Sequence, residues 1–183
     1  MFERFKADRA AKRAVKTRDW ATLVALLGDP DHHIRTNTAN ACMLLEPGSA
    51  PESLVVALLR AASDPEGEVR GQAVLALGSV RPPEAPDVFL RALSDEDWGV
   101  RMFAATAIGW MPDPRATSLL VGLLEDEQPF VRQFAVFALE KIGDPAVVPA
   151  IEALLENERD TEVKKWSRGA LKKLRRGSSV DPS

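Results

Sequence analysis

The sequence predicts an all-helical protein built from about five stacked helical pairs. Three observations support this fold class: one motif recurs every 31 to 35 residues, apolar residues in each copy follow helical spacing, and segments rich in Pro and Gly separate the copies. No segment alternates apolar and polar residues as a half-buried strand would. A single helical pair cannot bury its apolar faces alone, so we expect neighbouring pairs to stack into a solenoid.

The repeated motif places an acidic residue six positions before an arginine that follows an apolar residue. Its copies read DPDHHIR, DPEGEVR, DEDWGVR and DEQPFVR, and end at Arg35, Arg70, Arg101 and Arg132. The arginines are 35, 31 and 31 residues apart, and a degenerate copy, ENERDTEVK, ends at Lys164 a further 32 residues on. An apolar segment of about three turns precedes each motif, and a helix with one buried stripe follows it. The unit is therefore helix, tight turn, helix and loop.

This unit resembles the HEAT-like repeat of the phycobilisome-lyase type. The resemblance rests on the acid-to-arginine motif, the small residues of the second helix and Gly-Asp-Pro before the next repeat, and it extends over residues 19–175. A unit of about 31 residues is shorter than the roughly 40–47 of ordinary HEAT repeats. The first repeat departs by carrying Asn and Cys in its second helix, the second is longer, and the fifth has Lys164 and Ser167 in place of Arg and Ala. The resemblance implies a right-handed α-α superhelix.

The same pattern sets the expected domain organisation. We expect one solenoid domain over residues 1–176 and a disordered tail at 177–183, since GSSVDPS has almost nothing apolar to bury. A basic N-terminal cap helix is expected within residues 1–18, near 2–17, with Phe2, Phe5 and Ala10 covering the first repeat. The repeats are expected at approximately 19–47, 48–82, 83–113, 114–144 and 145–176.

Charge is unevenly distributed along a chain whose net charge is −3. Residues 1–18 hold seven basic and two acidic residues, residues 159–176 hold eight and two, and residues 19–158 hold nine and 22. We interpret the basic ends as polar caps of an elongated molecule, because terminal repeats need a polar outer face. No apolar run reaches the roughly 18 residues of a membrane span, and the basic N-terminus lacks the apolar core of a secretion signal. With its single cysteine, the chain is expected to be cytoplasmic.

Titratable residues form no catalytic or metal-binding pattern. The repeated acids are expected to cap helices, and each arginine to pair with an acid of its own or the next repeat. A catalytic role is not expected, because an active site needs one constellation rather than four copies. His32 and His33 are the only histidines, and adjacent helical residues diverge by about 100°, so we expect no metal and no cofactor. Cys42 falls on a buried stripe, where a thiol is expected to be inert. The sequence therefore predicts a protein that is not an enzyme.

Aromatic residues gather on one expected face of the second helices. In a HEAT solenoid that face lines the concave groove, and residues off the buried stripe point outward at about 100° per residue. Six of the 11 aromatic residues fall there: Phe103, Trp110, Phe130, Phe134, Phe137 and Trp166. Equivalent positions in the first two repeats are mostly polar, and Lys141, Lys165 and Lys173 lie at the rim. These rings are either flanking core or an exposed patch that anchors a partner.

We predict a non-enzymatic protein–protein interaction scaffold that holds a helix or extended segment of a partner protein in this groove. The expected binding residues are the six aromatics together with Lys141 and Lys173. One alternative is an accessory subunit resembling phycobilin lyases, which handle a protein-bound tetrapyrrole. A second is a nucleic-acid binder that uses the basic ends, which the acidic middle disfavours. The sequence predicts no membrane contact and no particular oligomeric state.

Overall fold

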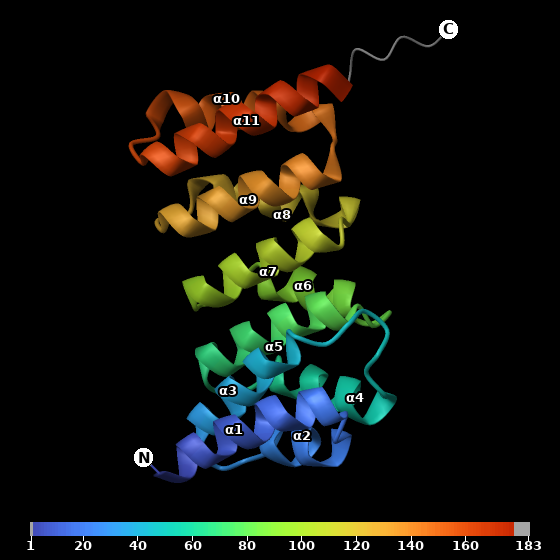
Figure 1. Ribbon diagram of the computed structural model, residues 1–183. Helices are drawn as coiled ribbons and strands as arrows, with labels where there is room; N and C mark the ends of the chain where they lie inside the picture. Colours follow the sequence, from blue (N-terminus) through green and yellow to red (C-terminus); the bar gives the residue numbers. More distant parts are fainter. Residues whose placement is uncertain (1, 178–183) are drawn as a thin grey trace, which may run out of the picture. The chain divides into compact units, whose positions relative to one another are not determined.

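The computed structural model describes residues 2–177, and every regular element in that range is helical (Figure 1). The α-helices are α1 (Phe2–Thr17), α2 (Trp20–Leu27), α3 (His32–Cys42), α4 (Glu52–Ala61), α5 (Gly67–Val80), α6 (Ala85–Ala92), α7 (Trp98–Trp110), α8 (Thr117–Gly122), α9 (Pro129–Ile142), α10 (Val148–Asn157) and α11 (Thr161–Gly177). Short 3₁₀ turns lie at η1 (Pro114–Ala116), η2 (Leu123–Glu125) and η3 (Pro145–Val147). The predicted all-α solenoid class is thus confirmed.

Each expected repeat range holds one helical pair, from α2 and α3 in the first to α10 and α11 in the fifth. Gly177, which was assigned to the tail, is the last residue of α11, and the rest of the predicted tail lies outside the described residues. Within residues 2–177 no helix combines the length and apolarity needed to cross a bilayer.

Short side chains define where the helices begin. Asp31 accepts the N–H of His33 at the start of α3, and Asp97 accepts the N–H groups of Gly99 and Val100 at the start of α7. These carboxylates satisfy donors that have no partner inside the helix. At the other end of α9, Gly143 adopts φ of +79°, a left-handed conformation that glycine takes without the strain of a Cβ.

The described residues group into two compact units, one within Met1–Val88 and one within Phe89–Ser183. In the first unit, α1 packs on α2 and α3, α3 packs on α5, and α2 packs on α4. Its fully buried side chains include Leu23, Leu54, Leu58, Val69 and Leu77.

In the second unit, α9 packs between α7 and α11, and α8 and α10 pack against α9 and α11 respectively. The second helices of the repeats thus form one layer of this unit and the first helices the other (Figure 1). Its buried core includes Leu120, Val131, Leu139 and Ile151. Helix α6 includes the boundary between the units, with Val88 in the first and Phe89 in the second.

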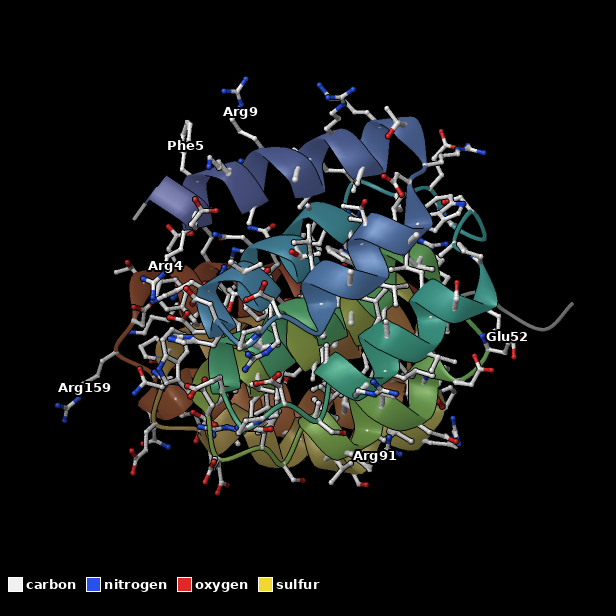
Figure 2. All side chains as sticks on the ribbon, turned by 90° about the horizontal axis from the view of Figure 1, so that it is seen from below. Arg4, Phe5, Arg9, Glu52, Arg91 and Arg159 are labelled. Carbon is white, nitrogen blue, oxygen red and sulfur yellow. The ribbon has the colours of Figure 1, made fainter. Side chains whose placement is uncertain are left out.

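Helix α1 lies where a cap was expected, but Phe5 is not part of its packed face, and the side chain of Phe2 lies outside the described residues. Phe5 is 61% exposed and Ala10 is only half-buried. Figure 2 shows Phe5 and Arg9 pointing outward from α1, and the Arg9 guanidinium carbon lies 6.0 Å from the Phe5 ring centre. Small and β-branched residues form the packed face instead: Ala11, Ala14 and Val15. The expectation for Phe5 was wrong because residues 5 and 11 are about 120° apart on a helix.

The arginines of the motif connect successive repeats. Arg132 donates from Nε and Nη2 to both carboxylate oxygens of Glu158 (2.7 and 2.8 Å), and from Nη1 to the backbone oxygen of Asp126 (2.7 Å). Arg35 pairs in the same way with Asp64, as Arg101 does with Asp126. The Arg132 and Glu158 side chains are 15% and 2% exposed. The expected pairing between repeats is confirmed at these three arginines, each of which joins two turns.

The acids of the motif do not cap the helices directly. Asp64 accepts the N–H of Glu66, and Asp126 accepts the N–H of Gln128, which are the residues that precede α5 and α9. Asp64 and Asp126 therefore each close a turn. Each also forms an ion pair with an arginine of the preceding repeat, Arg35 and Arg101 respectively. The hydrogen bonds from Arg132 lower the pKa of Glu158 to about 2, because they favour the charged carboxylate more than burial disfavours it.

Candidate functional site

Helix α9 carries the central stripe of the predicted aromatic face. Phe130, Phe134, Phe137 and Lys141 are spaced by four, three and four residues, which places them along one side of the helix. Because α9 packs between α7 and α11, this stripe has a neighbouring helix on either side. The face of α7, α9 and α11 in the second unit is therefore the surface on which the sequence-predicted residues meet.

Three of the predicted rings form one cluster, here called the ring cluster: Phe134, Phe137 and Trp166. The Phe137 centroid lies 5.8 Å from that of Trp166 and 6.3 Å from that of Phe134, both in edge-to-face geometry. Phe134 and Trp166 are 6.1 Å apart. All three side chains are half-buried. Both sequence interpretations therefore hold in part, because each ring packs on its neighbours and still presents surface to solvent.

Phe137 also packs closely against α7. A Cβ added to Gly109 would lie 2.1 Å from Cε1 of Phe137, so the ring occupies space that only glycine leaves free. The helical angle places Phe137 away from the buried stripe of α9, and its half-buried ring packs against α7. Its ring lies against α7 because Gly109 on that helix has no side chain.

An exposed aromatic pair lies at the N-terminal ends of α7 and α9. Trp98 and Phe130 stack with centroids 6.4 Å apart and planes inclined by 23°, and they are 43% and 57% exposed. Phe130 was predicted from the sequence, whereas Trp98 was missed because it precedes the helical register used there. A tryptophan within the acidic turn DEDWGVR was the signal that pointed to it.

The remaining predicted residues hold peripheral positions. Phe103 and Trp110 are half-buried on α7, and in residues 3–176 neither makes a ring contact with the cluster. Lys173 Nζ lies 2.7 Å from Glu140, and Lys141 Nζ lies 3.8 Å from the same carboxylate and 5.5 Å from the Phe137 ring centre. The two lysines thus contact one carboxylate on α9, which offsets one of their two positive charges.

The histidines lie closer together than was expected. The rings of His32 and His33 are 4.0 Å apart, and with Asp31 they place three possible ligand atoms within 4.8 Å of one another. The argument from helical divergence was therefore wrong, because adjacent rings can lean together at a helix start. However, Asp31 already accepts Arg4 Nε at 2.6 Å, and this cation opposes the binding of another. The ion pair with Arg4 therefore disfavours a metal ion at this cluster.

A model of HEAT repeats matches residues 54–128 and 92–172, which together make up more than half of the chain. The chain belongs to the HEAT-repeat family. No curated protein matches it by sequence.

Solved structures of HEAT and armadillo type share the fold. The complex of CpcE and CpcF of phycocyanin lyase from Nostoc sp. PCC7120 is similar, with a TM-score of 0.72 and 22% identity over 86% of this chain and 65% of that chain. A designed armadillo repeat protein in complex with the peptide (KR)4 has a TM-score of 0.68 and 20% identity over 91% and 86%. An engineered protein has a TM-score of 0.64 and 23% identity over 93% and 85%. At these identities the likeness establishes the HEAT-type fold alone.

Proposed function

We propose that this HEAT-repeat protein is a non-enzymatic binding module that holds a segment of a partner protein on the face of α7, α9 and α11. The observation that carries the proposal is the exposed Trp98–Phe130 pair, which lies at the end of the stripe that leads into the ring cluster. Aromatic side chains are the preferred anchors of protein interfaces, and they are strongest where partly exposed rings surround a packed centre.

The related folds support this proposal. The designed armadillo protein was solved with a peptide, and CpcE was solved with the partner protein CpcF. The layer of second helices presents the aromatic stripe here, so a helix or an extended segment is the occupant that fits it.

The titratable groups of the described residues favour binding over catalysis. Burial raises the pKa of the Cys42 thiol to about 12, so the thiol stays protonated and poorly nucleophilic at neutral pH. The buried Nδ1 atom of His32 has no hydrogen-bond partner, and the Asp31 carboxylate beside it is held by Arg4.

Affinity capture followed by hydrogen exchange tests the proposed surface. The wild-type chain and its Phe130→Ala variant are compared for binding of the protein captured from the source cell. Loss of this exposed anchor is expected to weaken binding by about 30-fold, the effect of a 2 kcal/mol hot spot. Leu119→Ala on α8, which is exposed to 39%, is the matched control and should bind as the wild type does.

Hydrogen exchange of the complex should show protection in α7, α9 and α11. If the captured protein binds Phe130→Ala with wild-type affinity and protects other helices, this surface is not the binding site. An unchanged complex of Leu119→Ala is required in both cases, since it shows that loss of an exposed apolar side chain has no general effect.

A second candidate function is chromophore handling, because the structural match to the phycocyanin lyase complex covers 86% of this chain, with a TM-score of 0.72. The same half-buried rings would then pack against a tetrapyrrole. Titration of a free bilin into the purified protein should in that case change the bilin's visible absorbance, and Phe137→Ala should reduce the change. An unchanged bilin spectrum with the protein in large molar excess over the bilin excludes this function.

A further inference from the structure

Trp98 and Phe130 form a pair that folding alone does not explain. Their near-parallel rings touch across two helices, yet 43% and 57% of their side-chain surface stays exposed. Both residues lie in the first turn of their helix, beyond the ring cluster. Solvent-exposed aromatic surface of this kind marks interaction sites more often than it supports a fold. The chemistry around the pair then determines which ligand it favours.

Acidic turns precede both rings. The sequence Asp95-Glu96-Asp97 leads into Trp98, and Glu125-Asp126-Glu127 leads toward Phe130. Two arginines follow in the same motif copies, and both are engaged: Arg101 pairs with Asp126 and Arg132 with Glu158. The Arg101–Asp126 and Arg132–Glu158 pairs are each neutral, and in the described part of the chain Asp97, Glu125 and Glu127 make no side-chain ion pair. These three carboxylates give the two turns a net negative charge.

The helix starts contribute a smaller field of the opposite sign. Each helix N-terminus is equivalent to about half a positive charge. Asp97 offsets this at α7 by accepting two N–H groups of the first turn, at 2.7 and 3.4 Å. The start of α9 has no side-chain cap. The sum of the two termini, at most about one positive charge, is outweighed by the excess of carboxylates.

We propose that the Trp98–Phe130 pair binds a cationic side chain, arginine or lysine, of a basic partner segment. This inference rests on the proposed function and specifies the chemistry of the partner. A cation over an indole face is attracted by the quadrupole of the ring, and a guanidinium also stacks flat on it. Glu127 is exposed, lies three residues before Phe130 and makes no side-chain ion pair in the described part of the chain. Its carboxylate would supply a negative charge for a cation bound at the pair.

Other ligands fit the pair less well. An acidic segment would be repelled by the carboxylates of both turns. A purely apolar segment would make no favourable charge interaction with them. The rim lysines do not alter this, because Lys141 and Lys173 contact Glu140 near the other end of α9.

Peptide binding tests the inference directly. The probes are two fluorescein-labelled decapeptides, one alternating arginine with glycine and one alternating glutamate with glycine, and the readout is fluorescence anisotropy. The arginine peptide should bind the wild-type protein, and the glutamate peptide should not. Trp98→Ala is expected to weaken binding of the arginine peptide by about 3- to 30-fold. Leu119→Ala should leave it unchanged.

Two further variants separate ring chemistry from apolar contact. Trp98→Leu keeps an apolar side chain but has no aromatic face, so it should lose affinity as Trp98→Ala does. Trp98→Phe keeps a face and should retain most of the binding. Thermal melts of every variant confirm that the second unit remains folded, as expected for a side chain that is 43% exposed.

Each alternative outcome overturns the inference. If Trp98→Leu binds like the wild type, the contact is apolar and not cationic. If Trp98→Ala and Trp98→Leu both bind the arginine peptide as Leu119→Ala does, the peptide binds elsewhere. If only the glutamate peptide binds, the charge assignment is wrong. If neither peptide binds while Phe130→Ala still loses the captured protein, the cation site fails and the proposed function stands. If the captured protein binds Phe130→Ala normally, the proposed function itself fails.

Discussion

Gly109 on α7 and Phe137 on α9 are in a contact that leaves no room for a side chain at residue 109 while the ring keeps its position. A Cβ at residue 109 would lie 2.1 and 2.5 Å from two ring atoms of Phe137, far inside van der Waals contact. The ring is also confined on its other sides by Phe134 and Trp166. The close approach of one helix thereby fixes the orientation of the ring cluster.

Gly109→Ala should destabilise the second unit although alanine is the better helix former. The intrinsic gain of about 1 kcal/mol is outweighed by overpacking, which costs about 1–3 kcal/mol in a confined site. Phe137→Ala removes the clash, so the double variant should be more stable than the sum of the two single changes predicts. Thermal melts of the four proteins measure this coupling. Strict additivity would show that the ring moves aside freely.

Arg132→Ala should cost far more stability than Arg115→Ala. Arg132 and Glu158 are 15% and 2% exposed, so removal of one partner leaves a buried charge, at a cost of about 3–5 kcal/mol. Arg115 pairs with Asp113 in the same unit but is 59% exposed, and such pairs contribute about 0–1 kcal/mol. Urea unfolding of both variants gives the comparison. Equal midpoints would mean that the arginine pairs between repeats do not stabilise them.

Glu158 should make stability depend on pH in the acid range. Its pKa is lowered from 4.5 to about 2 by hydrogen bonds from Arg132, so the folded state favours the carboxylate. This stabilisation is present above about pH 4.5 and is lost as the pH falls through about 2, below which the group is protonated in both states. The difference in Tm between wild type and Glu158→Gln should shrink on acidification. A difference that is constant from pH 7 to pH 3 contradicts the assignment.

Phe130→Ala and Phe137→Ala should separate binding from folding. Phe130 is 57% exposed, so its loss is expected to change stability by no more than about 0.5 kcal/mol. Phe137 packs on Gly109 and the ring cluster, so its loss should approach the lower end of the about 3–5 kcal/mol typical of buried phenylalanine. Differential scanning calorimetry measures both. Equal effects of the two changes would mean that Phe130 is core as well.

The periodicity of the sequence was enough to predict the helical pairs, because helix patterning is local. The Pro and Gly segments, the acid-to-arginine motif and the apolar stripes each depend on residues a few positions apart. The repeat also predicted that the arginines are paired, and the structure decided between an acid of the same repeat and one of the next, since Arg35, Arg101 and Arg132 each reach the equivalent acid of the next copy. The aromatic enrichment of the later repeats was visible in the same register.

Tertiary packing alone decided which aromatic residues are accessible. Helical angles placed Phe137 outward, but Gly109 has no side chain, and the ring fills the space that this leaves against α7. They did not reveal Trp98, whose exposure and stacking on Phe130 depend on a helix one repeat away. Phe5, expected in contact with the first repeat, is exposed because smaller residues of α1 pack there. One sequence determines its own helices through neighbouring residues, whereas exposure is set by side chains that only folding brings into contact.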